Sequence, residues 1–289
     1  MNLKEVKHRI LSVKSTQKIT SAMKLISAAK LHRAQLAVEG IHPYRSKLND
    51  MLASLIADTS VVASPYIVER DVRRVTLIAV ASNTSMCGGF NSNVIRKLRE
   101  VVDGYKASGV EIEIYSVGKK MDEAIAKMGL VSNESLMSQA GSPRYSSLAA
   151  VATDIMQQYK TGATDRVEIV YSFPLSGSKQ QPMAECLLPF GLGDAVQADN
   201  VPAGDFIVEP GNDAFLSQLL PKVITLRLFE ALLDSAIAEH SARMLAMQIA
   251  TDNATDLIAE LTLEYNKGRQ QAITNEILDI MSGSLGKNR

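Results

Sequence analysis

The sequence lacks several features that would mark a membrane or disulfide-rich protein. It has no tryptophan, 5% aromatic residues and two cysteines, Cys87 and Cys186, in 289 residues. Two cysteines allow at most one disulfide, which favours a reducing cytosol. There is no run of about 18 uncharged apolar residues, so we expect no membrane-spanning helix. The first ten residues have neither the apolar segment of a secretory signal nor the composition of a transit peptide. The 46% of hydrophobic residues is enough for a folded core, and we expect a soluble protein.

The chain also lacks a net charge, because 31 Lys and Arg balance 31 Asp and Glu. This balance is a cancellation between regions. Residues 1–33 hold eight basic residues and one acid, for a net charge of +7, whereas residues 180–221 hold six acids and no Lys or Arg. A charged run is commonly just a solvated face, but each of these regions can also meet a partner of opposite charge.

Glycine and proline are scarce at both ends of the chain, where the pattern is helical. From residue 3 to about residue 59 the only breakers are Gly40 and Pro43, which could kink the helix or split it in two. Between Pro221 and Gly283 the only Gly or Pro is Gly268. A single helix over residues 222–282 would be about 90 Å long at 1.5 Å per residue, too long for a compact protein of this size.

The C-terminal helix carries the pattern of a coiled-coil seam. Spacings of three and four alternate over four heptads, in the order Ile237, His240, Met244, Met247, Thr251, Ala254, Ile258, Leu261 and Tyr265. Such a stripe needs a partner helix, and the N-terminal segment can supply it. We therefore predict an antiparallel coiled coil of the two chain ends, with a dimeric coiled coil as the alternative. Because several seam residues are small or polar, we expect weaker packing than in a Leu/Ile zipper.

The middle of the chain predicts an open, Rossmann-like α/β domain with a mostly parallel sheet, because β-branched runs of strand length alternate with helical stretches. The expected strands are 74–82, 110–117 and 166–173, with a further edge strand at 181–190, and the expected helices are 92–107, 119–128 and 146–159. The domain boundaries that follow are 1–64 for the N-terminal helix, 65–208 for the α/β domain and 209–289 for the C-terminal helix.

The α/β segment contains one candidate phosphate loop, Cys-Gly-Gly-Phe-Asn at residues 87–91, directly after the first strand. It matches neither dinucleotide-binding nor Walker A spacing, so we interpret it as a structural turn with Cys87 as a small packed residue. The four histidines, one of which is His240, have no metal-ligand spacing. No catalytic arrangement stands out, so we expect no active site, no cofactor and no metal.

The basic N-terminal helix is the strongest candidate for a binding surface. On a helical wheel one arc of about 100° holds Lys4, Lys7, Lys14, Lys18 and Arg33. Such a stripe could grip DNA phosphates, as basic regions of leucine-zipper proteins do. Here, however, apolar residues such as Ile19 and Met23 are interleaved with the lysines. An acidic protein partner with apolar pockets therefore fits better, and a DNA-binding coiled coil is the alternative hypothesis.

Several motifs then resemble the gamma subunit of F-type ATP synthases, in the right order along the chain. They are TQKIT at 16–20, AMK at 22–24, AAKL at 28–31, CGGFN at 87–91, EH at 239–240, ARM at 242–244, AM at 246–247, ATDNA at 250–254, YNK at 265–267, RQ at 269–270, AIT at 272–274 and EI at 276–277. The resemblance covers both ends and the middle.

This resemblance implies a non-catalytic rotor. In the family, the terminal helices form an asymmetric coiled coil that turns inside a hexamer of catalytic beta and non-catalytic alpha subunits, and the α/β domain lies at the membrane c-ring. The rotor couples the flow of protons, or of sodium ions, to ATP synthesis or hydrolysis. The implied partners are the alpha, beta and epsilon subunits and the c-ring, with one copy of the chain per complex, no nucleic acid and no small-molecule substrate. The implied location is peripheral, on the cytoplasmic face of a bacterial inner membrane.

The resemblance also assigns contact residues. Met23 and Arg243 match the zone where the shaft meets acidic loops of the catalytic subunits. Arg269, Gln270 and Thr274 match positions that catch loops of those subunits, and Glu209 matches the foot near the c-ring. One departure is clear: where the family usually has Ser/Thr-Asp-Arg/Lys-Gly-Leu before Cys-Gly-Gly, residues 82–86 are Ser-Asn-Thr-Ser-Met. The resemblance therefore assigns no contact residue to that loop.

Overall fold

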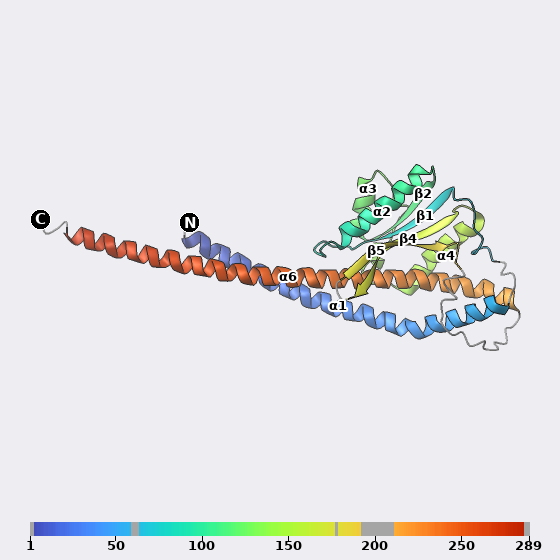
Figure 1. Ribbon diagram of the computed structural model, residues 1–289, viewed down its shortest axis with the longest axis horizontal. Helices are drawn as coiled ribbons and strands as arrows, with labels where there is room; N and C mark the ends of the chain where they lie inside the picture. The colour runs from blue at the N-terminus through green and yellow to red at the C-terminus, as the bar shows by residue number, and fades with distance from the viewer. Residues whose placement is uncertain (1–2, 59–63, 177–178, 192–210, 286–289) are drawn as a thin grey trace. The chain divides into compact units, whose positions relative to one another are not determined.

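The computed structural model describes residues 3–58, 64–176, 179–191 and 211–285, which form two long helices and an α/β sheet (Figure 1). In chain order the elements are α1 (Leu3–Asp58), β1 (Arg74–Val80), α2 (Phe90–Ala107), β2 (Glu111–Val117), α3 (Lys119–Lys127), β3 (Glu134–Ser135), η1 (Met137–Gln139), α4 (Tyr145–Thr161), β4 (Arg166–Ser176), β5 (Lys179–Leu188) and α6 (Asn212–Leu285). The chain divides into two compact units. The first comprises Met1–Ser27 with Met244–Arg289, and the second comprises Ala28–Arg243.

The second unit contains a five-stranded sheet in the order β3-β2-β1-β4-β5. β1 pairs in parallel with β2 and β4, and β2 pairs in parallel with β3. β5 pairs antiparallel with β4 and forms one edge. The predicted strands and the mostly parallel sheet are thus confirmed, and the suggested edge strand at 181–190 is present as β5. The sequence analysis missed β3, which has two residues and so carries no strand pattern.

Helices cover both faces of this sheet (Figure 1). On one face, α2 and α3 contribute to a cluster of buried residues that includes Leu77 of β1 and Leu98 of α2. On the other face a larger cluster joins α4 to the second half of α1 and the first half of α6, and it includes Ile78 of β1 and Leu52 of α1. Except for its first residue, β1 is buried along its length, as expected for a central strand between two helical layers.

The expected helix breakers do not interrupt either long helix. α1 continues through Gly40 and Pro43 as one helix, which settles the choice between a single helix and two. α6 begins at Asn212, earlier than the predicted start at residue 222, and contains Pro221. Proline removes one helical hydrogen bond. Here Leu220 and Val223 on either side of Pro221 are buried in the core, and this packing holds the helix.

The first unit is a two-helix coiled coil that runs antiparallel. Gln17 donates a hydrogen bond to Thr255 (2.7 Å), and the hydroxyls of Thr20 and Thr251 lie 2.8 Å apart. Partner numbers on α6 therefore fall as those on α1 rise. In α6 the predicted seam is confirmed from Met244 onward, since the buried and half-buried positions include 244, 247, 251, 254, 258, 261 and 265.

Gly268 lies in this unit close to the start of α1. A Cβ at this position would come 3.2 Å from Cδ2 of Leu3, so the residue allows a close approach of the two helices. Its place in the sequence, as the lone glycine of a long helical stretch, therefore has a packing reason. Within the described ranges, no helix has both the length and the apolar character needed to cross a bilayer.

Candidate functional site

The loop that follows β1 is fixed from inside by the side chain of Asn91. The Oδ1 atom of Asn91 accepts a hydrogen bond from the backbone N–H of Ser82 (3.1 Å), and its Nδ2 atom lies 3.2 Å from the sulfur of Cys87. Cys87 is a free thiol, 1% exposed, in a small cluster with Phe90 and two alanines of α6. The prediction of Cys87 as a packed residue is confirmed. The motif at residues 87–91 joins the loop after β1 to α2 through hydrogen bonds of the Asn91 side chain.

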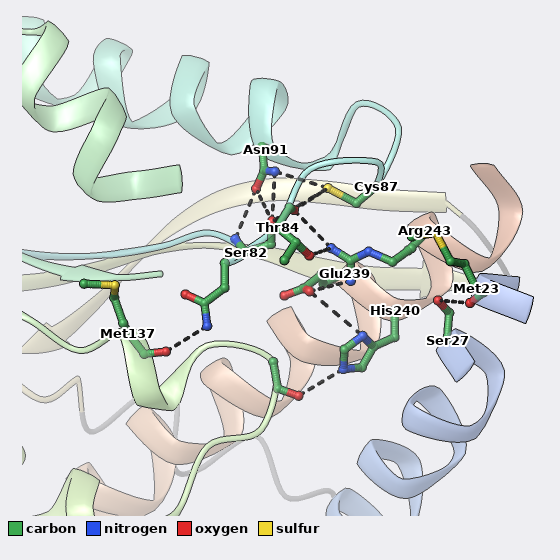
Figure 2. A network of polar contacts seen from close by, with 12 residues as sticks. Met23, Ser27, Ser82, Thr84, Cys87, Asn91, Met137, Glu239, His240 and Arg243 are labelled. Carbon is green, nitrogen blue, oxygen red and sulfur yellow. Dashed lines mark hydrogen bonds and ion pairs between the residues drawn. The ribbon is translucent and has the colours of Figure 1, made fainter. Parts of the chain in front are cut away.

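Arg243 of α6 reaches this loop at Thr84 (Figure 2). Its Nη2 atom donates to the carbonyl oxygen of Thr84 (3.2 Å) and to the Thr84 hydroxyl (3.1 Å). Its Nη1 atom donates to Oε1 of Glu239, one helical turn away, at 2.6 Å. Arg243 is 8% exposed and Glu239 is 6% exposed. The guanidinium is therefore turned into the protein, and its charge is balanced by a buried carboxylate.

His240 lies beside this ion pair and is also buried. Its Nε2 atom is 3.0 Å from the carbonyl oxygen of Gly141. A carbonyl can only accept, so Nε2 carries the proton. Burial lowers the pKa of His240, against the smaller opposing effect of Glu239, and the imidazole is neutral at pH 7. Gly141 has a φ of 74°, in the left-handed region that favours glycine, and a Cβ there would lie 3.5 Å from both Glu239 and His240.

A cavity of about 310 Å³ opens next to these residues, and its wall includes Lys30, Arg33, Asn83, Glu239 and Arg243. Lys30 and Arg33 are exposed, and neither forms an ion pair among the residues that the structure describes. Three cations thus face one carboxylate that is already paired. Such a cavity favours acidic groups. In the described part of the chain, no three His, Cys, Asp or Glu side chains are grouped so as to hold a metal ion.

Met23 belongs to the first unit and lies on α1. It is half-buried, and its carbonyl oxygen accepts a hydrogen bond from the hydroxyl of Ser27 (2.8 Å). The neighbouring seam position is Thr20, which meets Thr251 across the helix pair. The seam is thus polar at this level, as the sequence analysis predicted.

The other assigned contact residues lie on α6 of the first unit or outside the described residues. Arg269, Gln270 and Thr274 are all exposed. The Thr274 hydroxyl donates to the carbonyl oxygen of Gln270 (2.9 Å), which places these two residues on one face. Glu209 lies outside the described residues. Of the basic stripe on α1, all five members are exposed, namely Lys4, Lys7, Lys14, Lys18 and Arg33.

Sequence reasoning missed the two partners of Arg243. Glu239 carried a signal, because Glu and Arg four residues apart on a helix commonly pair. Thr84 carried none, since its bond to Arg243 joins residues 159 positions apart and depends on the tertiary fold. The unusual sequence at residues 82–86 drew attention to this loop but did not predict its contact with Arg243.

Sequence comparisons cover nearly the whole chain. A profile of a family described as ATP synthase matches residues 2–285. The ATP synthase gamma chain of Phocaeicola vulgatus is 47% identical over 286 residues, which is 98% of this chain and 99% of the relative. The gamma chain of Flavobacterium johnsoniae is 38% identical over 291 residues, or 99% of each chain.

Comparison with solved structures supports the same fold. A rotor chain of the Euglena gracilis mitochondrial ATP synthase matches with a TM-score of 0.63 and 19% identity, over 94% of this chain and 98% of that chain. A chain from another rotational state of the Euglena enzyme gives a TM-score of 0.66, over 98% of this chain and 94% of that one. At such low identity these matches speak only for the fold, which agrees with the sequence comparisons. The chain belongs to the family of ATP synthase gamma chains.

Proposed function

We propose that this chain is the central-stalk rotor subunit of a proton-translocating bacterial F-type ATP synthase. It is a non-catalytic subunit, and the enzyme is the complex. The observation that carries the proposal is the antiparallel coiled coil of the two chain ends, in a chain that belongs to the gamma family over nearly its whole length. In this role the coiled coil turns inside the catalytic hexamer and changes the shape of each catalytic site in turn.

The surface of the two helices suits this role. The seam at Thr20 and Thr251 is polar, and the exposed side of α1 combines lysines with apolar residues such as Ile19 and Leu25. A surface that must pass several partners in turn should adhere strongly to none of them. Polar and small contacts bury less apolar area and therefore bind more weakly than a Leu/Ile surface.

The proposed partners are the alpha and beta subunits around the helices, with the epsilon subunit and the c-ring at the foot, and one copy of this chain per complex. Met23, Arg269, Gln270 and Thr274 are proposed contacts to the catalytic ring, and their partial or full exposure supports this. Arg243 is proposed to lie in the same zone of the shaft, with its guanidinium turned inward. Lys30 and Arg33, at the basic cavity, are added to these contacts because they are exposed and unpaired among the described residues.

The foot is proposed to include Glu209, on the c-ring side. The proposed three-part division assigns 1–64 and 209–289 to the two shaft helices and 65–208 to the α/β domain, so Glu209 stands at the boundary between the domain and the second shaft helix. The proposed location is peripheral, at the cytoplasmic face of the bacterial inner membrane.

A DNA-binding coiled coil is the alternative, and the comparisons give it no support. The exposed basic stripe of α1 fits acidic protein loops equally well on charge, and the apolar residues between the lysines favour protein.

The experiment is a pull-down of the tagged full chain from its own cells, followed by identification of its partners and their stoichiometry. The proposal predicts one copy of the chain with three copies each of two nucleotide-binding subunits. Isolation of that hexamer without the chain but with full coupled ATP synthesis would refute it. Salt-sensitive capture of duplex DNA by the chain would instead support the alternative.

A further inference from the structure

Arg243 is assigned by family resemblance to a contact with the catalytic ring, yet the structure turns its guanidinium inward. Glu239, Arg243 and Thr84 form one connected group, which we call the Arg243 latch (Figure 2). Both charged members are more than nine-tenths buried. The guanidinium already donates to a carboxylate, a carbonyl and a hydroxyl within the protein, and its Nε is buried without a hydrogen-bond partner among the described residues, so the charged end of Arg243 points inward.

The latch joins two parts of the second unit that are distant in sequence. Glu239 and Arg243 lie on α6, and Thr84 lies in the loop between β1 and α2. The Thr84 carbonyl also accepts a hydrogen bond from the hydroxyl of Ser82 (2.6 Å), whose backbone N–H is held by Asn91. The loop is therefore held to α2 at Ser82 and to α6 at Thr84.

Thr84 is uncharged, and this matters at the contact. A cation at position 84 would bring a like charge to the guanidinium of Arg243 in place of a hydroxyl acceptor. Asn83, the preceding residue, is also fixed by hydrogen bonds. Its Nδ2 donates to the carbonyl of Met137 (2.9 Å) and its Oδ1 accepts from the N–H of Lys119 (3.0 Å). An aspartate could make only the second of these bonds.

We propose that Thr84 and Glu239 are positioning residues for Arg243, and that Arg243 serves coupling by fastening α6 to the loop after β1 and not by touching the catalytic ring. This inference rests on the proposed rotor function. When the hydrogen bonds of the Arg243 latch are formed, α6 and the sheet domain of the second unit rotate together. Torque on α6 is then transmitted fully to the sheet domain. The uncharged residue at position 84 is what lets the latch close in this chain.

The first test compares substitutions in the loop, in the complete ATP synthase reconstituted in vesicles. Thr84→Arg brings a cation to the guanidinium of Arg243 and should lower the ratio of ATP-driven proton pumping to ATP hydrolysis severalfold. Thr84→Ser keeps the hydroxyl and should leave the ratio at its wild-type value. Ser85→Arg is the matched control, because Ser85 is exposed and makes no hydrogen bond to Arg243 among the described residues. Equal ratios for Thr84→Arg and Ser85→Arg would overturn the inference.

The second test separates a latch from a direct contact. If Arg243 acts through the latch, Glu239→Gln should lower the pumping ratio as Arg243→Gln does, and the double variant should be no worse than either single one. If Arg243 instead touches an acidic loop of the ring, Glu239→Gln should leave the ratio intact and only the Arg243 variant should lower it. That second pattern would overturn the proposal.

The two tests are also distinct from a failure of the proposed function. Each variant complex is first checked for its subunit stoichiometry, and each purified chain for its thermal unfolding. A wild-type chain that does not co-assemble with the hexamer refutes the rotor itself. An assembled wild-type complex in which the latch variants pump normally refutes only the latch.

Discussion

At the scale of single residues, α6 carries two kinds of buried charge. Glu239 and Arg243 form a close pair that neutralises itself. Asp234, nearer the start of the helix, forms no ion pair among the described residues. Its pKa is raised to about 6, mainly by burial and in part by Glu230, against the opposing effect of Arg45. The first arrangement stabilises the fold only while both partners remain, whereas the second costs stability whenever the carboxyl is ionised.

Breaking the close pair should therefore be costly. We expect Glu239→Gln to lower the free energy of unfolding of the full chain by about 3 kcal/mol, because it leaves the buried guanidinium without a counter-charge. Urea unfolding followed by circular dichroism measures this. Glu276→Gln, at an exposed position of the same helix, is the control and should change stability little. Equal stabilities for the two variants would show that the carboxylate of Glu239 does not support Arg243.

Asp234 predicts a pH dependence of stability. Its pKa is raised from 3.8 to about 6, so the folded state holds a proton that the unfolded chain has already lost. Stability is thus favoured at pH 4 and falls as the pH rises through 6. We expect Asp234→Asn to raise the free energy of unfolding by about 2 kcal/mol at pH 8 and to leave it nearly unchanged at pH 4. Thermal unfolding at both pH values checks this, and a variant that gains as much at pH 4 as at pH 8 would contradict it.

At the scale of elements, the helices and strands follow from patterns that lie within a short stretch of sequence. The alternation of three and four along α6 gave its seam, and the β-branched runs gave β1, β2 and β4, because both patterns come from local periodicity. The expected start of α6 at residue 222 was wrong, because the helix continues through Pro221. Burial of Leu220 and Val223 in the core outweighs the helix-breaking effect of the proline. The contact of Arg243 with Thr84 could not be predicted from local patterns either, because it joins two segments that are distant in sequence.

The polar seam gives a prediction at this scale. The hydroxyls of Thr20 and Thr251 face each other across α1 and α6 at 2.8 Å. Replacing both by valine exchanges a polar pair for apolar groups of the same shape, which is close to neutral or stabilising, whereas each single change leaves one hydroxyl without its cross-helix partner and should cost about 1 kcal/mol.

A double-mutant cycle on thermal unfolding of the full chain measures this coupling. The prediction is that Thr20→Val and Thr251→Val are each destabilising and that the double variant recovers the wild-type stability or exceeds it. Two single effects that simply add in the double variant would mean that the hydroxyls do not act on each other.

At the scale of the whole molecule, two compact units share two continuous helices. One unit is a coiled coil with polar and apolar residues exposed, and the other is a sheet domain covered by helices on both faces. A coiled coil can enter a ring of other subunits, and a sheet domain offers a broad surface for a second partner. These two kinds of surface suit the proposed rotor role.

Rotation is the central claim, and single-molecule rotation tests it most directly. The catalytic hexamer is fixed to a surface with this chain assembled in it, and a bead is attached through Ser108→Cys, an exposed position after α2. The rotor assignment predicts that ATP drives the bead in one direction, at a rate that follows ATP hydrolysis. A complex that hydrolyses ATP while the bead shows only random motion would contradict it.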